Sequence, residues 1–165
     1  MTEQGNDMPI LSGGCQCGAV RFRLTGRPGT SSVCYCRMCQ KASANQALAL
    51  VSQGEASFEW TRGQPSWFQS SNAARRGFCK DCGTALAYDA PDGLALAVLA
   101  FDDPDQVPPV IAYGVEAKRM WCDAIPALPE RDTMEDAEAV AFLRTLVSHQ
   151  HPDHDTEAWP PETKP

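Results

Sequence analysis

Seven of the eight cysteines in this chain lie in three short clusters, and no other feature limits the possible folds as much. The clusters are Cys15-Gln16-Cys17, Cys34-Tyr35-Cys36-Arg37-Met38-Cys39 and Cys79-Lys80-Asp81-Cys82. Two cysteines this close together on a turn can direct both sulfur atoms at one ion, at the usual Zn–S distance of about 2.3 Å. The spacing therefore predicts a chain that folds around tetrahedral metal ions, with zinc as the expected metal.

The number of clustered cysteines predicts two kinds of site and two Zn²⁺ ions per chain. Four thiolates close a tetrahedral structural site, whereas three protein ligands leave one coordination position open for water or substrate. Spacing alone does not decide which clusters pair. We assign the open site to the cluster that has three cysteines, Cys34, Cys36 and Cys39. The structural site is assigned to the other two clusters, Cys15, Cys17, Cys79 and Cys82.

Disulfide bonds are the competing interpretation of a cysteine-rich chain. Residues Met1–Gly14 contain neither the basic segment nor the apolar segment of a secretory signal. Disulfides persist mainly in oxidising compartments. We therefore expect reduced thiols and a cytoplasmic location.

The clusters and their flanking residues resemble the glutathione-dependent formaldehyde-activating enzyme family, which includes centromere protein V. The resemblance rests on three segments and continues less sharply to Glu130: Leu11-Ser12-Gly13-Gly14-Cys15-Gln16-Cys17-Gly18-Ala19-Val20, Cys34-Tyr35-Cys36-Arg37-Met38-Cys39-Gln40-Lys41 and Arg76-Gly77-Phe78-Cys79-Lys80-Asp81-Cys82-Gly83-Thr84-Ala85-Leu86. It implies a small, mainly β domain of the β-tent type, a structural zinc on the first and third clusters and a catalytic zinc on the middle one. The implied reaction joins glutathione and formaldehyde to give S-(hydroxymethyl)glutathione.

Three positions depart from the pattern of that family. Tyr35 stands where relatives often carry a histidine that is not a ligand, so metal binding is expected to persist. Tyr113 lies near a position where many relatives have a histidine, which puts the substrate preference in question. Cys122 is expected to be a small buried apolar residue and not a ligand.

One domain is expected from 165 residues. Short apolar runs between turn residues predict strands at Gly18–Leu24, Gln46–Val51, Thr84–Tyr88 and Leu94–Phe101. A short helix at Ala42–Ala49 is an open alternative. The predicted divisions are a flexible N-terminus (1–10), the zinc-binding domain (11–130), a C-terminal helix (131–148) and a disordered tail (149–165).

The C-terminal part has one amphipathic helix signal and one polar tail. Asp132 with Glu135 forms a capping-box pattern, followed by apolar residues at helical spacing to about Ser148. The tail carries four prolines and three histidines, His149, His151 and His154. We expect no specific metal site in it, because a disordered segment is a poor cage.

Charge is unevenly distributed, although the chain as a whole has a net charge of −7. Nine Lys and Arg residues face two acids from Ile10 to Lys80, whereas seventeen acids face five bases from Asp81 onward. A zinc site with three thiolates is already anionic, so binding a further thiolate favours nearby cations. The candidates for holding an anionic thiol are Arg37, Lys41, Arg75 and Arg76.

These features favour a zinc-dependent carbon–sulfur lyase that acts on thiol adducts of small aldehydes, with glutathione as the expected thiol partner. The alternative is a non-catalytic, zinc-stabilised binding module of the same fold. Nucleic acid is not an expected partner, because the chain is acidic and has no long Lys/Arg run. Membrane insertion is not expected either, since no apolar run approaches about 20 residues.

Overall fold

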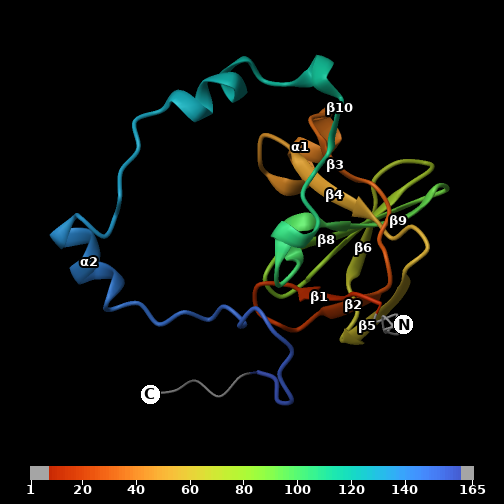
Figure 1. Ribbon diagram of the computed structural model, residues 1–165, viewed down its shortest axis with the longest axis horizontal. Helices are drawn as coiled ribbons and strands as arrows, with labels where there is room; N and C mark the ends of the chain where they lie inside the picture. Colours follow the sequence, from red (N-terminus) through yellow and green to blue (C-terminus); the bar gives the residue numbers. More distant parts are fainter. Residues whose placement is uncertain (1–7, 161–165) are drawn as a thin grey trace, which may run out of the picture.

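Two β-sheets form the centre of the fold in the computed structural model, which describes residues 8–160. The smaller sheet has the order β1-β2-β5 and contains Ile10–Gly14, Arg21–Thr25 and Ser57–Arg62. The larger has the order β10-β3-β4-β9-β8-β7-β6 and contains Ile111–Tyr113, Ser31–Cys34, Leu48–Ser52, Gly93–Ala97, Ala85–Ala90, Arg75–Phe78 and Ser66–Gln69. The prediction of a mainly β fold is confirmed (Figure 1).

The core lies between the two sheets. Phe22 and Leu24 of β2 are fully buried, as are Leu86 of β8 and Leu96 of β9. Around Phe22 the aromatic rings pack edge to face, with ring centroids 5.0 Å away for Phe101 and 6.0 Å away for Trp60. Alternation along β2 places Phe22 and Leu24 on the same, inward side of the strand. Buried residues of both sheets thus belong to one hydrophobic core.

Two predicted elements differ from the structure near the middle of the chain. The proposed helix at Ala42–Ala49 is wrong, because α1 spans Arg37–Ser43 and begins inside the middle cysteine cluster. Its C-cap is Ala44, which adopts a left-handed conformation with φ of 50°. The strand predicted to reach Phe101 ends at Ala97, and a short 3₁₀ helix, Val98–Ala100, follows it.

The C-terminal helix is shorter than the predicted 131–148. Helix α2 spans Ala137–Leu143, and its N-cap is Asp136, whose carboxylate accepts hydrogen bonds from the amides of Glu138 and Ala139. Asp132 instead caps a turn by accepting from the Met134 amide. No residue of α2 is buried, and Figure 1 shows this part of the chain away from the sheets. The apolar spacing therefore lacks the packing that would extend the helix.

Three further 3₁₀ helices, Pro104–Gln106, Val115–Ala117 and Met120–Ala127, occur in the connections. Within residues 8–160, none of the helices has the length and apolar character needed to cross a membrane.

The prediction of a disordered tail is wrong for its first part. His151 is only 3% exposed, and its backbone amide donates to the carbonyl of Gln16. The indole of Trp159 donates to the carbonyl of Cys17 at 2.7 Å. The tail therefore returns to the first cysteine cluster and covers it. Residues 161–165 lie outside the described part of the chain, as do residues 1–7 of the predicted flexible N-terminus.

Ion pairs hold the tail against the smaller sheet. Asp155 accepts hydrogen bonds from Arg21 at 2.8 Å and from Arg23 at 3.1 Å. Arg21 is 2% exposed and also pairs with Asp102 at 2.6 Å. Burial alone would raise the pKa of Asp155, but the bonds from Arg21 and Arg23 hold it below its ordinary value.

Replacing Asp155 by asparagine is expected to destabilise the fold at neutral pH. The loss should be about 1 kcal/mol, because the carboxylate is partly screened by solvent, or a fall of about 2 to 4 °C in melting temperature. A lowered carboxyl pKa stabilises above the unfolded-state pKa and loses its effect as pH falls through the native value. The deficit of D155N should therefore shrink in acid. Asp153→Asn, an exposed neighbour, is the matched control, and equal melting of both variants at neutral pH would contradict the role of the tail.

Candidate metal centres

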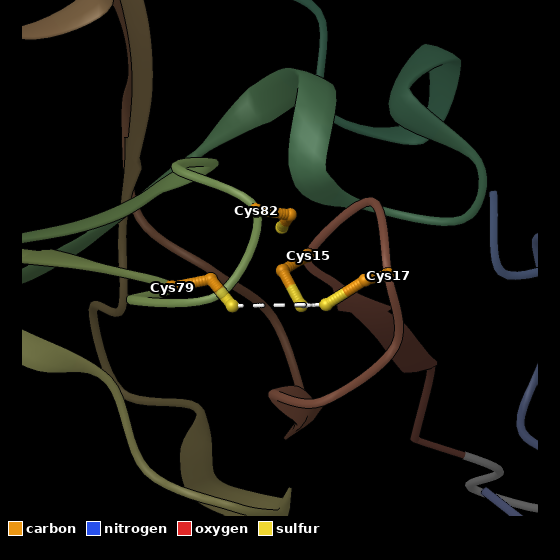
Figure 2. Close-up of side chains that lie close together, drawn as sticks. All are labelled: Cys15, Cys17, Cys79 and Cys82. Carbon is orange, nitrogen blue, oxygen red and sulfur yellow. Dashed lines mark hydrogen bonds between the residues drawn. The ribbon is translucent and has the colours of Figure 1, made fainter. Parts of the chain in front are cut away.

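The first and third cysteine clusters meet in space (Figure 2). The Cys15 and Cys17 sulfurs are 3.6 Å apart, and those of Cys17 and Cys79 are 3.8 Å apart. All four sulfurs, including that of Cys82, lie within 4.8 Å of one another. A tetrahedral ion with bonds of about 2.3 Å places its sulfur ligands roughly 3.8 Å apart. The spacing therefore fits zinc.

Two loops with the same backbone pattern present these four sulfurs. Cys15 and Cys17 follow β1, and Cys79 and Cys82 lie between β7 and β8. In each loop a glycine amide donates to the first cysteine carbonyl at 2.9 Å, from Gly18 to Cys15 and from Gly83 to Cys79. Both glycines have φ near 80°, +79° and +80°, a region that favours glycine. Because one loop belongs to each sheet, a metal ion here would join the two sheets.

The protonation chemistry of this group also fits a cation. Burial raises the pKa of the Cys15 thiol to about 12. Burial would raise that of Cys82 as well, but hydrogen bonds from Thr84 and from the Cys17 backbone lower it to about 6. Buried thiols resist ionisation unless a positive charge is close, and a zinc ion bound here would supply that charge.

The middle cluster forms a separate group of three sulfurs, Cys34, Cys36 and Cys39, all within 4.8 Å of one another. Cys34 ends β3, Cys36 is the N-cap of α1, and Cys39 lies in its first turns. The Cys36 sulfur accepts from the Cys39 amide at 3.4 Å. Cys39 is buried, whereas the other two are half-buried. Three sulfurs, two of them on half-buried residues, could bind a metal ion and leave a position for a fourth ligand.

Residues that the sequence did not single out hold this cluster in shape. The amide nitrogen of the buried Gln40 side chain donates to the carbonyls of Tyr35 at 2.7 Å and Ala117 at 3.0 Å. Gly114 has φ of 64° and lies close to Cys36. A Cβ atom added to Gly114 would lie 2.6 Å from the backbone nitrogen of Cys36. In the sequence, these two residues are a glutamine directly after the last cysteine of the cluster and a lone glycine after β10. Neither could be recognised as supporting the cluster without knowing that β10 lies beside β3.

Arg76 reaches the middle cluster from β7. Its Nη2 lies 3.5 Å from the Cys39 sulfur, although 37 residues separate the two. Burial raises the pKa of Cys39 to about 12, and the hydrogen bond from Arg76 offsets part of that rise. Arg76 thus supplies a buried positive charge beside a candidate metal ligand.

The other predicted cations are placed differently. Arg37 and Lys41 are exposed on α1, and both line a polar pocket of about 400 Å³ together with Gln40, Gln46 and Trp121. Arg75 points away from Arg76, pairs with Asp89 at 2.7 Å and lies over the Trp67 ring. The structure therefore brings Arg76 to the cysteines, places Arg37 and Lys41 beside the same helix, and gives Arg75 other partners.

Cys122 and the tail histidines lie outside both candidate metal groups. Cys122 is 7% exposed, as expected for a small apolar residue. Burial lowers the pKa of His151, whose Nε2 lies 3.2 Å from Nη1 of Arg62. Of the described residues, only the seven clustered cysteines form candidate metal groups.

Comparisons with known proteins show which family the chain resembles. The family model of the glutathione-dependent formaldehyde-activating enzyme matches residues 10–123. A Halomonas elongata protein named for this same family is 33% identical over 85 residues, which cover 47% of this chain and 54% of that protein. A Schizosaccharomyces pombe protein described as an uncharacterized lyase is 28% identical over 86 residues, 52% of this chain and 62% of that one. The chain thus spans a little over half the length of these relatives.

A solved structure of a Rhodobacter sphaeroides protein also matches. It is 19% identical, with a TM-score of 0.47, and the match covers 61% of this chain and 98% of that one.

Proposed function

Because the chain belongs to the glutathione-dependent formaldehyde-activating enzyme family, we propose that it is a carbon–sulfur lyase that forms and cleaves adducts between a glutathione-like thiol and a small aldehyde. The observation that carries the proposal is the group of three sulfurs, those of Cys34, Cys36 and Cys39. Among the described residues no fourth cysteine joins this group, so a tetrahedral ion bound there would keep one position for a substrate thiol. Zinc held there would lower the pKa of a bound thiol so that the thiol is ionised at neutral pH.

The residues around the cluster suit a thiol with charged ends. Arg37 and Lys41 lie one turn apart on α1 and give the polar pocket two positive side chains. Gln46 adds a carbonyl oxygen that is buried and, within residues 8–160, lacks a hydrogen-bond partner. Two cations and an acceptor match the carboxylates and N–H groups of a peptide such as glutathione. We propose that this pocket orients the thiol toward the cysteines.

A thiol titration of protein substituted with cobalt tests the proposal. Glutathione should add a sulfur-to-cobalt charge-transfer band that saturates with concentration, and Cys36→Ser should abolish the change. If no thiol alters the spectrum of the protein loaded at both sites, the lyase proposal fails and the non-catalytic binding module is favoured.

Glutathione is expected to bind more tightly at low salt than its diester, in which both carboxylates are masked and the ammonium is the charged group that is left. If exposed pairs contribute about 0.2 to 1 kcal/mol each, two pairs change affinity from about twofold to thirtyfold, and high salt should reduce the difference. Titrations at two ionic strengths measure it. The double variant Arg37→Gln/Lys41→Gln should lose the preference. The control Arg131→Gln/Arg144→Gln removes the same number of charges from exposed residues outside the pocket and should keep it. Equal affinities for the two thiols at low salt would rule out the cationic pocket.

A further inference from the structure

A second pocket lies on the larger sheet and differs in character from the polar one. Its volume is about 360 Å³. Eleven of its twelve lining residues are apolar or glycine, including Ala42 of α1, Leu48 and Leu50 of β4 and Phe68 of β6. The twelfth is Arg76. An apolar pocket of this size with one polar group is typical of a small-molecule site.

Arg76, which lines that pocket, has an unused donor. Its side chain is 8% exposed, its Nε donates to Ser70 at 3.1 Å, and its Nη2 faces Cys39. Among residues 8–160, Nη1 is buried without a hydrogen-bond partner. Burying an unpaired N–H of a charged group is costly. A ligand oxygen accepting from Nη1 would remove that cost.

Helix α1 separates the two pockets. Arg37, Gln40, Lys41 and Ala44 lie on one face of the helix and line the polar pocket. Cys39 and Ala42 lie on the opposite face, by the 3.6-residue period, and Ala42 lines the apolar pocket. The cysteine cluster at the start of α1 therefore has a charged pocket on one side of the helix and an apolar pocket on the other.

From this arrangement we infer that the apolar pocket binds the carbonyl half of the substrate, and that the aldehyde is one with an apolar chain of several carbons. The inference rests on the proposed lyase function and specifies its substrate class. Formaldehyde has two heavy atoms and would leave most of the pocket empty, since the volume is roughly tenfold the ~30 Å³ of a water molecule in the liquid. The carbonyl oxygen would accept from Nη1 of Arg76.

The reaction balances without an oxidant. In the forward direction a carbon–sulfur bond forms between thiol and carbonyl carbon, the carbonyl π bond opens, and the proton lost by the thiol ends on the carbonyl oxygen. The product is a thiohemiacetal, and the reverse steps release the aldehyde. Arg76 stabilises negative charge on the oxygen while the proton is in transit.

Binding of S-alkylglutathiones tests the inference without turnover, because these thioethers cannot release an aldehyde. Dissociation constants for the S-methyl, S-propyl, S-butyl and S-hexyl compounds would be measured calorimetrically on the zinc-loaded protein. Affinity should rise about fourfold for each methylene that enters the pocket, which corresponds to about 0.8 kcal/mol. Ala42→Phe should fill the pocket and flatten this rise.

Ala141→Phe is the control, because it makes the same substitution on an exposed helical residue of α2, outside both pockets. It should keep the chain-length dependence, and both variants should melt like the parent protein. A flat series in the parent protein, with glutathione still binding, would overturn this inference alone. A rise that survives in Ala42→Phe, or is lost equally in Ala141→Phe, would also overturn it. If glutathione itself does not bind, the lyase proposal fails and the inference with it.

Discussion

Replacing Cys82 by serine is expected to lower the free energy of unfolding by at least about 4 kcal/mol, a fall of roughly 8 to 16 °C in melting temperature. The reason is that Cys82 helps four sulfurs from two loops meet, one loop from each sheet. Structural zinc contributes on the order of 10 to 16 kcal/mol in zinc peptides, against a net stability of about 5 to 15 kcal/mol for a domain. A thermal melt and the zinc content measure the effect.

Cys122→Ser controls for the loss of a thiol in a buried place. Cys122 is 7% exposed and belongs to neither sulfur group, so its replacement buries a hydroxyl at a cost of about 1 to 3 kcal/mol and leaves the zinc content unchanged. Cys82 is only half-buried, and its replacement should leave no large cavity. If Cys82→Ser melted no lower than Cys122→Ser, a structural metal at this site would be ruled out.

The candidate metal centres were the most predictable part of the molecule, because the ligands within each cluster are local in sequence. The three-sulfur group needs only the turn after β3 and the start of α1. Pairing of the other two clusters could not follow from spacing, since Cys17 and Cys79 are 62 residues apart. It was assigned from the ligand count, because only the middle cluster has three cysteines. The family resemblance implied the same pairing, and the match over residues 10–123 confirms the family.

The C-terminal part was less predictable, because its structure depends on contacts with distant residues. Composition indicated disorder after His149, yet Asp155 contacts Arg21 across 134 residues. Periodicity indicated a helix from Asp132, but α2 has no buried face that would sustain it. Secondary-structure propensity carries no information about such long-range contacts, and in this part of the chain they decide which residues are ordered and which are helical.

The adjacent Arg75 and Arg76 show how much of the candidate site can be predicted from the alternation of side chains along a strand. Alternation along β7 requires Arg75 and Arg76 to point to opposite faces. The position of α1 relative to the larger sheet decides which of the two arginines lies beside Cys39. The sequence therefore predicted a pair of candidate cations, and the topology selects Arg76.

Replacing Cys36 by serine is expected to leave the domain folded and to weaken thiol binding by more than about a hundredfold. Cys36 is the N-cap of α1 and accepts from the Cys39 amide. Serine is a preferred N-cap residue, so the helix start is retained and the melting temperature should change by no more than about 2 to 4 °C. Replacing a residue that only supports a metal ligand lowers metal affinity by about 10 to 100-fold. Replacing the ligand itself should lower it further.

Cys36→Ala separates the two roles of this residue. It removes both the cap and the sulfur, and should melt below Cys36→Ser by about 1 kcal/mol of stability while losing thiol binding to the same extent. Zinc analysis should give one ion per chain for both variants, against two for the parent protein, because the four-sulfur group is untouched. If Cys36→Ser melted as low as Cys82→Ser, the division into a structural and an open site would be wrong. If it melted normally and kept its affinity for glutathione, the thiol would bind somewhere other than this cluster.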